Sequence, residues 1–407
     1  MFYPRTIHHG LEENIRHFPV VVLTGPRQTG KSTEVWKLKE KGFQYVSLDN
    51  LDERSLALND PKFFLTLHPA PIVIDEIQYA PILMEAIEEQ VNQRRLEQGD
   101  ANGMFVLTGS QSFQLMKGIT QSLAGRACIM EMTCLSAREL QMESDIPFLP
   151  GVHCFSRSQE KSVSDLYQSI VRGFFPELHR NPQLTATSFY DSYIRTYIER
   201  DVSDLIQPSN KLLFKNFMEY LASITSSQLN YAVISRAIGI DPKTVQAWIS
   251  ILETSGIIYL LQPYSEEKLT KRIVKSPKIY FCDTGLAAHL AKIYSPDHLA
   301  ISSLAGAYME NYVINEIRKS YLNCCEPLSM YYYRDNNQNE IDLVLVSNRT
   351  LYRIEIKKGV SFNHRHVSGF RQLDHSELSL GPGAILCNTP KPYAIERDIF
   401  VLPYSCI

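Results

Sequence analysis

The stretch Val20-Val-Val-Leu-Thr-Gly-Pro-Arg-Gln-Thr-Gly-Lys-Ser-Thr33 decides the fold of the first part of this chain. It begins with a run of apolar residues, passes through a glycine loop and ends in residues that suit the first turn of a helix. Residues 25–32, here called the phosphate loop, match G-x-x-x-x-G-K-[ST] at every fixed position. The stretch therefore predicts a nucleotide-binding loop between a buried strand and a helix.

Each residue type of the phosphate loop has a chemical reason. Glycines let the backbone turn tightly and bring its N–H groups to phosphate oxygens, and the following helix points its positive end at the same anion. Lys31 would reach the β- and γ-phosphates of ATP, and the Ser32 hydroxyl would ligate Mg²⁺. We expect nucleotide contacts from Gly25, Pro26, Arg27, Gln28, Thr29, Gly30, Lys31, Ser32 and Thr33.

Length and composition are those of a globular protein with more than one domain. A chain of 407 residues is too long for one compact core, which predicts two or three domains. The net charge of −3 gives no global sign of nucleic-acid binding, although a local basic patch stays compatible with it. Scattered cysteines, no secretory start and no apolar run of about 20 residues predict a cytoplasmic protein with free thiols and no membrane segment.

A second apolar run ends in two acids and would complete an ATPase site. Residues 71–78 read Pro-Ile-Val-Ile-Asp-Glu-Ile-Gln, and the carboxyl end of such a strand opens at the ligand edge of a parallel sheet. Asp75 would hold Mg²⁺ directly or through water, and Glu76 would orient and activate the attacking water. Alternating strands and helices over residues 1–150 predict an α/β domain with right-handed crossovers.

Four polar positions are candidates for a role at the γ-phosphate. Ser110, or its neighbour Gln111, follows the strand expected at residues 103–110 and would sense the phosphate or position the water, unless it is a plain loop start. Arg126 would stabilise the charge that develops in phosphoryl transfer, in cis or from a neighbouring copy in a homo-oligomer. A Gly-Arg pair is also typical of a surface turn, and Arg27 is a second candidate for the same role.

Five motifs occur in an order that resembles a large group of poorly characterised prokaryotic AAA+-type P-loop ATPases. Members of that group join an ATPase domain to a C-terminal region of unknown function, and the resemblance continues through nearly the whole chain. It implies an AAA-like P-loop fold and ATP binding, with no settled substrate. The motifs are Gly25-Pro-Arg-Gln-Thr-Gly-Lys-Ser32, Ser47-Leu-Asp49, Ile74-Asp-Glu-Ile-Gln78, Leu107-Thr-Gly-Ser-Gln111 and Ser122-Leu-Ala-Gly-Arg126.

The middle of the chain predicts a winged helix after a connector. Linker and connector helices are expected over residues 151–208, and the winged-helix domain over residues 209–298. Within it, two helices are followed by two strands, with basic side chains in the hairpin that would follow a DNA backbone. The alternative is a module that packs against protein and leaves its hairpin solvated. The basic residues are Lys268, Lys271, Arg272, Lys275 and Lys278.

The last domain, residues 299–407, predicts an α/β fold of the restriction-endonuclease-like, PD-(D/E)xK type. Glu310 lies on the apolar stripe of an expected helix, where a carboxylate is costly unless it faces a partner or a metal. Period-two alternation puts Glu355 and Lys357 on one face of a strand, next to a strand with Asp342. The resemblance implies that Glu310, Asp342 and Glu355 ligate Mg²⁺ and that Lys357 helps to generate the attacking hydroxide. An ion pair of Lys357 with Glu340 or Glu355 is the alternative.

These parts predict a Mg²⁺-dependent enzyme that binds and hydrolyses ATP. In the favoured hypothesis, nucleotide state is coupled to a C-terminal module that associates with DNA and has nuclease activity. In the alternative, the chain is a nucleotide-dependent switch that binds a protein partner through a catalytically inactive nuclease-like domain.

Overall fold

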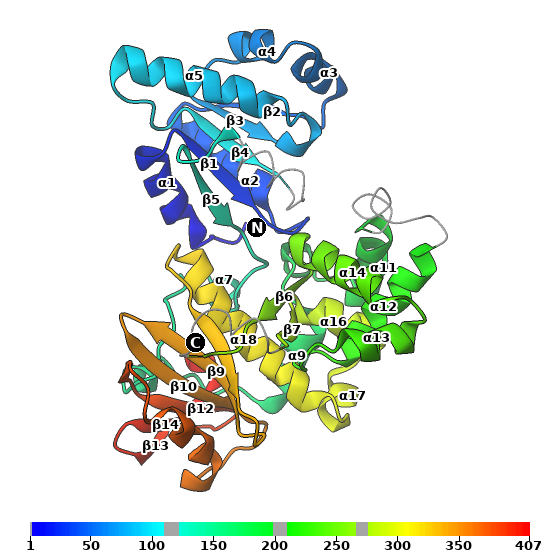
Figure 1. Cartoon of the computed structure of the whole chain (residues 1–407), viewed down its shortest axis with the longest axis vertical. Helices are drawn as coiled ribbons and strands as arrows, with labels where there is room; N and C mark the ends of the chain where they lie inside the picture. The colour runs from blue at the N-terminus through cyan, green and yellow to red at the C-terminus, as the bar shows by residue number, and fades with distance from the viewer. Residues whose placement is uncertain (1, 110–121, 198–209, 266–275) are drawn as a thin grey trace.

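The computed structural model describes residues 2–109, 122–197, 210–265 and 276–407, and three sheets organise this part of the chain. The first lobe, at the top of Figure 1, holds a parallel sheet of five strands in the order β2-β3-β4-β1-β5. Its strands are β1 (Val20–Thr24), β2 (Gln44–Ser47), β3 (Ile72–Asp75), β4 (Phe105–Thr108) and β5 (Ala127–Glu131). The predicted parallel sheet is confirmed.

Helices cover both faces of this sheet, which explains why its central strands β1, β3 and β4 are apolar up to their last residue. Val20 and Val22 of β1 pack into one core, whereas Val21 and Leu23 pack into another on the opposite face. The helices and 3₁₀ turns of the lobe are α1 (Ile7–His17), α2 (Lys31–Trp36), η1 (Lys37–Lys41), α3 (Leu51–Asn59), α4 (Pro61–Leu67), η2 (Ile77–Tyr79) and α5 (Leu83–Gln98).

The middle module is mostly helical. The two helices before the β6–β7 hairpin, α13 and α14, lie where the winged-helix prediction expects them, and the assignment to that fold stays a prediction. Lys268, Lys271, Arg272 and Lys275 of the hairpin lie outside the described residues. The elements are α7 (Ala137–Leu140), α8 (Cys154–Arg157), α9 (Val163–Arg172), α10 (Pro176–Arg180), α11 (Ala186–Tyr197), α12 (Lys211–Ser223), α13 (Tyr231–Ile238), α14 (Pro242–Thr254), β6 (Ile258–Leu261), β7 (Lys278–Phe281), α16 (Thr284–Leu290) and α17 (Pro296–Ile301).

The C-terminal module consists of the long helix α18 (Ala305–Asn323) and a mixed sheet. Strands β8, β9 and β10 are antiparallel, β12 and β14 continue the sheet in parallel with β10, and β13 and β11 flank it. The remaining elements are β8 (Met330–Arg334), β9 (Glu340–Ser347), β10 (Thr350–Ile356), η5 (His364–Leu373), β11 (Ser379–Leu380), β12 (Gly383–Cys387), β13 (Tyr393–Glu396), β14 (Ile399–Pro403) and η6 (Tyr404–Cys406).

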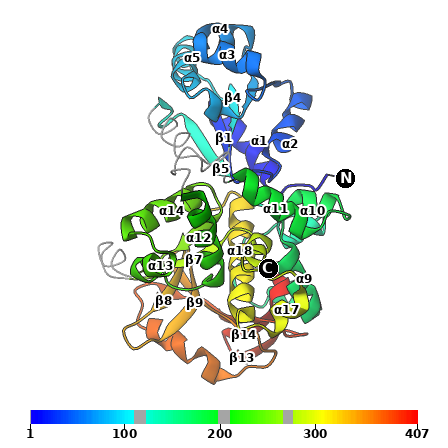
Figure 2. The same cartoon turned by 90° about the vertical axis from the view of Figure 1, so that its right-hand side faces the viewer.

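The middle and C-terminal modules are joined more closely than the sequence predicts. Figures 1 and 2 both show α18 running through the centre of the lower half of the molecule. The chain beyond β6 pairs with β8, since the Tyr264 N–H donates to the Tyr332 carbonyl at 2.6 Å and the Tyr332 N–H donates to the Gln262 carbonyl at 3.1 Å. One continuous apolar cluster extends from Cys134 to Cys406 and includes side chains of both modules.

None of the helices in the described ranges has the length and apolar character that crossing a membrane requires.

Candidate functional site

The backbone of the phosphate loop depends on its two glycines. Gly25 has φ 145° and Gly30 has φ 98°, values that glycine adopts without strain. A Cβ atom on Gly25 would lie 2.2 Å from the Met132 carbonyl oxygen, so no other residue fits against the end of β5. Lys31 is the first residue of α2, and its ammonium donates to the Gly25 carbonyl at 2.9 Å and the Pro26 carbonyl at 2.7 Å.

Lys31 is buried, and this changes its acidity. Burial lowers the pKa of Lys31 to about 8; the Glu76 carboxylate opposes this shift, and the nearby Arg27 guanidinium adds to it. The charged form is therefore costly in the loop unless an anion joins it. A phosphate group is the anion that a loop of this geometry accepts.

Ser32 and Asp75 lie next to each other at the carboxyl edge of the sheet. The Ser32 hydroxyl is 3.2 Å from Asp75 Oδ1, although the two residues belong to different strand–loop units. Asp75 is 3 % exposed and also accepts hydrogen bonds from the Tyr45 hydroxyl at 2.7 Å and from the Thr108 hydroxyl. Hard hydroxyl and carboxylate oxygens at this spacing fit Mg²⁺.

Glu76 follows Asp75 in a left-handed backbone conformation, with φ 60° and ψ 44°. Its N–H donates to the Thr108 hydroxyl at 3.3 Å, and its carboxylate accepts a hydrogen bond from the Gln78 amide. Tyr45, Thr108 and Gln78 were not predicted as site residues. Thr108 and Gln78 are polar residues at or just after the carboxyl ends of strands, and this position could have indicated a role in the site. Tyr45 lies within a strand, and nothing in the local sequence indicates such a role for it.

A cavity of about 570 Å³ adjoins the phosphate loop. The loop residues Gln28 and Thr29 line one side, and the aromatic rings of Tyr3 and Phe189 line others. The cavity thus lies where the N-terminal segment, the loop and α11 of the middle module meet, and it has the mixed apolar and polar character of small-molecule sites.

The structure does not bring Arg126 to its own phosphate loop. Arg126 directly precedes β5, whose first residue pairs with Val20 at the start of β1, whereas the phosphate loop follows the end of β1. The Arg126 guanidinium contacts Glu88 at 3.2 Å and Asn92 at 2.9 Å on α5. Ser110, the other predicted γ-phosphate contact, lies outside the described residues, as does Gln111.

A network of hydrogen bonds connects the phosphate loop with α18. Arg5, which is 8 % exposed, donates to the Thr29 carbonyl at 2.8 Å and to the Thr133 carbonyl at 2.8 Å, and forms an ion pair with Glu139. The Thr133 hydroxyl in turn donates to the Asn323 side chain at 3.2 Å. The loop backbone is therefore linked to the last residue of α18.

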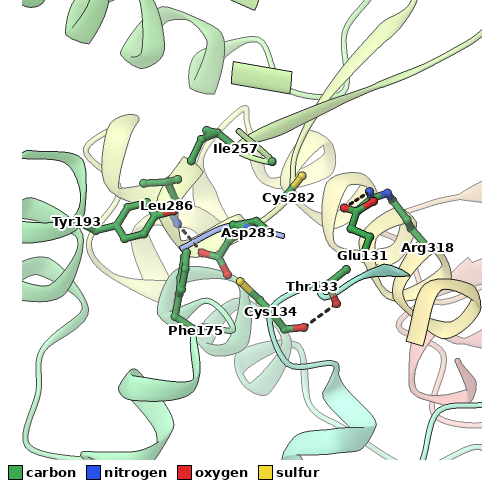
Figure 3. A pocket seen from close by; sticks show the side chains of 12 residues that line it. Glu131, Thr133, Cys134, Phe175, Tyr193, Ile257, Cys282, Asp283, Leu286 and Arg318 are labelled. Carbon is green, nitrogen blue, oxygen red and sulfur yellow. Dashed lines mark hydrogen bonds and ion pairs between the residues drawn. The ribbon is translucent and has the colours of Figure 1, made fainter. Parts of the chain in front are cut away.

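A second contact connects the first lobe with α18. Figure 3 shows Glu131 and Arg318 facing each other beside Asp283, and their ion pair measures 2.7 Å. Pro26 of the phosphate loop lines the same small cavity. Asp283 caps α16 through the Leu286 N–H and also accepts hydrogen bonds from the Phe174 N–H and the Tyr190 hydroxyl.

In the C-terminal sheet, Asp342, Glu355 and Lys357 converge. The Lys357 ammonium lies 3.0 Å from Asp342 Oδ2 and 2.5 Å from Glu355 Oε2. Asp342 and Glu355 are 8 % and 5 % exposed, and the Ile356 N–H also donates to Asp342. Burial and the Asp342 charge raise the pKa of Glu355 to about 8, while Lys357 opposes this shift.

Glu310 faces a lysine that was predicted for another role. Lys278 was expected in the basic hairpin that would meet DNA, and that expectation is wrong, because β7 buries it. Its ammonium lies 3.0 Å from Glu310 Oε1 and 2.6 Å from Glu340 Oε1. The Tyr280 hydroxyl also donates to Glu310 at 2.6 Å. Burial raises the pKa of Glu310 to about 7 against the opposing charge of Lys278, and the Asp342 charge adds to the rise.

We call Glu310, Glu340, Asp342 and Glu355 the acidic cluster. In the described part of the chain, no group of three or more histidine, cysteine, aspartate or glutamate side chains is arranged to hold a metal ion. In this conformation the ammonium groups of Lys278 and Lys357 bind oxygens of Glu310, Asp342 and Glu355, and the role of these three residues as Mg²⁺ ligands stays a prediction.

Three family descriptions match successive parts of the chain. Residues 17–141 match the family described as AAA domain. Residues 163–297 match a domain of unknown function, DUF8612, and residues 305–407 match a second one, DUF4143.

Similar proteins are found among curated sequences and solved structures. Two uncharacterized proteins, from Mycobacterium bovis and Mycobacterium tuberculosis, are each 27% identical over 354 residues, which is 86% of this chain and 72% of theirs. A Walker-type ATPase of Pyrococcus abyssi is 14% identical, with 70% of this chain and 94% of that chain covered and a TM-score of 0.44. A RuvB variant of Thermotoga maritima is 16% identical, with coverages of 66% and 93% and a TM-score of 0.31.

Residues 17–141, which hold the phosphate loop and all five strands of the parallel sheet, thus match the AAA domain family, and residues 305–407 match DUF4143.

Proposed function

We propose that this chain binds ATP together with Mg²⁺ and hydrolyses it at the phosphate loop. The observation that supports this most directly is the 3.2 Å contact between Ser32 and Asp75 beside the buried Lys31 ammonium. A phosphate site with Mg²⁺ needs both a cation for the phosphates and a hydroxyl–carboxylate pair for the metal, and Lys31, Ser32 and Asp75 supply this combination.

The residues of the site divide the work of hydrolysis. Lys31 binds the β- and γ-phosphates and neutralises their charge, and Ser32 and Asp75 hold the metal. When bound, Mg²⁺ neutralises charge that develops on the phosphate oxygens. Glu76 orients and activates the attacking water, and the Gln78 amide holds the Glu76 carboxylate in place. The adenine base occupies the 570 Å³ cavity between the loop and α11.

Two variants test the ATPase. Lys31→Ala should abolish nucleotide binding in a fluorescent ATP-analogue titration, because the phosphates lose their cation. Glu76→Gln should bind ATP normally and retain it, with turnover lowered by about 10²-fold or more. Lys62→Ala is the matched control, since Lys62 is an exposed lysine that pairs with Glu89 on the surface of the lobe. Normal turnover in both test variants would refute the assignment.

We further propose that nucleotide state reaches the C-terminal module through α18. The support is the chain of contacts from Thr29 through Arg5 and Thr133 to Asn323. Asn323→Ala should leave ATP affinity intact and remove the effect of an ATP analogue on hydrogen exchange in β8–β10. Unchanged analogue-dependent exchange in that variant would contradict the route.

A second candidate function is hydrolysis of DNA phosphodiesters by the C-terminal module. The convergence of Asp342, Glu355 and Lys357 supports it, and the lysine-filled acidic cluster instead favours a nucleotide-dependent switch that binds a protein partner. Plasmid incubated with the protein, ATP and Mg²⁺ separates the two. Cleavage that Asp342→Ala removes supports the nuclease, whereas an intact plasmid together with DNA binding absent at physiological salt supports the switch.

A further inference from the structure

Lys278 reaches the acidic cluster from outside the C-terminal module. It is the first residue of β7 in the middle module and is 3 % exposed. Its ammonium bridges α18 and β9, because it binds Glu310 on the helix and Glu340 on the strand. A lysine side chain is seldom buried so completely, since its flexible stem normally carries the charge to water.

The backbone around Lys278 holds this side chain in the cluster. Gln228 forms a β-bridge with Lys278, and the Leu229 N–H donates to the Pro277 carbonyl at 2.8 Å. The Ser226 N–H donates to the Ile279 carbonyl at 2.7 Å. These backbone contacts fix the position of residues 277–279. The Lys278 side chain therefore starts from a fixed point next to the carboxylates.

Lys278 and Lys357 together hold the oxygens that a metal would need. Lys357 binds Asp342 and Glu355, while Lys278 binds Glu310 and Glu340. Lys357 belongs to the same strand segment as Glu355, whereas Lys278 comes from another module. A divalent cation takes about six oxygen ligands, and it would have to displace at least one ammonium group to obtain them.

We infer that Lys278 is a resident cation of the acidic cluster, which excludes divalent metal as long as the middle module is docked on β8. The inference rests on the second candidate function, because it concerns the cluster proposed there as a Mg²⁺ site. It assigns the regulation of that cluster to one residue of a different module.

Metal binding by the full chain tests this inference. Mn²⁺ binding is measured by titration calorimetry in the absence of nucleotide. All proteins in this experiment carry Ser32→Ala, which suppresses Mn²⁺ binding at the phosphate loop. Lys278→Met should bind Mn²⁺ at least about tenfold more tightly than the background protein. Adding Asp342→Asn should remove this gain, and Lys278→Arg, which retains the charge, should show none. A folded Lys278→Met variant that binds Mn²⁺ no better than the background would overturn the inference.

A second measurement needs no substitution at Lys278. In unmodified protein, acetylation of lysines followed by mass spectrometry should find Lys278 protected and the exposed Lys62 reactive. Millimolar Mn²⁺ should leave the labelling of both lysines unchanged, because the docked Lys278 ammonium excludes the metal from the acidic cluster. Labelling of Lys278 at the rate of Lys62 without metal would show that the ammonium is not held, and the inference would fail.

The two proposals fail separately. If Lys278→Met gains Mn²⁺ binding while plasmid stays intact in every variant, the inference stands and the nuclease is refuted. If plasmid is cleaved by unmodified protein and Lys278→Met gains no metal, the nuclease stands and the role of Lys278 is refuted.

Discussion

Asp145 is a buried acid whose ionisation opposes folding. It is 6 % exposed and accepts a hydrogen bond from Asn323 at 2.7 Å and one from the Thr6 hydroxyl at 3.3 Å. Burial, together with the nearby charge of Glu139, raises the pKa of Asp145 to about 6. The native state therefore binds a proton that the unfolded chain releases near pH 4.

The sign of this shift gives a pH-dependent prediction. Because the native pKa is higher than the unfolded one, Asp145 lowers the free energy of unfolding as pH rises from about 4 to 6, and the full cost of up to about 3 kcal/mol applies above pH 6. Asp145→Asn should therefore raise the urea midpoint at pH 8 and change it little at pH 4. The exposed Asp100→Asn variant is the control, and an equal midpoint shift at both pH values would contradict the assignment.

The residues of the ATPase site differ in how visible they are in the sequence. Lys31, Ser32, Asp75 and Glu76 stand in two short motifs, so the local sequence pattern is enough to select them as candidates. The burial of Lys278 depends on packing between β7, α18 and β9, which are far apart along the chain. Its basic neighbours in the hairpin favoured a solvent-exposed interpretation, and no local signal contradicted it.

At the scale of elements, the end of α9 and the start of α16 lie so close together that only glycine fits between their backbones. Gly173 has φ +74°, and a Cβ atom there would lie 1.9 Å from the Tyr190 hydroxyl. A Cβ atom on Gly285 would lie 2.7 Å from the Gly173 backbone. Two glycines thus permit the contact that lets Asp283 accept its hydrogen bonds from α11 and from the Phe174 N–H.

An alanine at the α9–α16 contact should lower the free energy of unfolding far more than an alanine at a glycine with open space around it. Gly173→Ala should lower the free energy of unfolding by about 3 kcal/mol or more, because it adds overpacking to backbone strain. Gly99→Ala is a control with a similar φ of +76°, the ordinary left-handed conformation and nothing within 4 Å of its added Cβ, and it should lower the free energy of unfolding by about 1 kcal/mol. Urea unfolding compares the two, and equal losses would show that crowding at α9 is not important.

Elements with strong periodicity could be predicted, and the contacts between modules could not. The parallel sheet could be predicted because β1 and β3 are apolar up to their last residue. The strand–turn–strand pattern of β9 and β10 could be predicted from the alternation of their residues. The pairing of residues 262–264 with β8 was missed, because a short apolar extension of a hairpin does not indicate which sheet it joins. Register between distant segments is set by the shared core, which single-strand patterns do not encode.

At the scale of the whole molecule, the position of Arg126 bears on assembly. It lies at the amino edge of the first sheet, bound to Glu88 and Asn92, and the phosphate loop lies at the carboxyl edge. We propose that Arg126 contributes to hydrolysis only from a neighbouring copy of the chain.

Mixing two inactive variants tests this assembly. Lys31→Ala lacks the lysine that binds the phosphates, and Arg126→Ala lacks the arginine that would stabilise the transition-state charge. Each variant should therefore be inactive alone. An equal mixture should recover about a quarter of the wild-type ATPase rate, because that share of sites combines an intact loop with an intact neighbouring arginine. Co-purification of differently tagged copies verifies subunit exchange. Exchange without recovery, or full activity of Arg126→Ala alone, would exclude the arrangement.

The single apolar cluster that runs from Cys134 to Cys406 has a consequence for how such proteins diversify. The first lobe keeps two cores of its own around its sheet, so a lineage can replace it or alter it as a unit. The middle and C-terminal modules both contribute side chains to this cluster, and the C-terminal module has a further core besides it. A substitution within the shared cluster therefore changes the packing of both modules. The two matched domains of unknown function should therefore be inherited as a pair, with compensating changes across their common core.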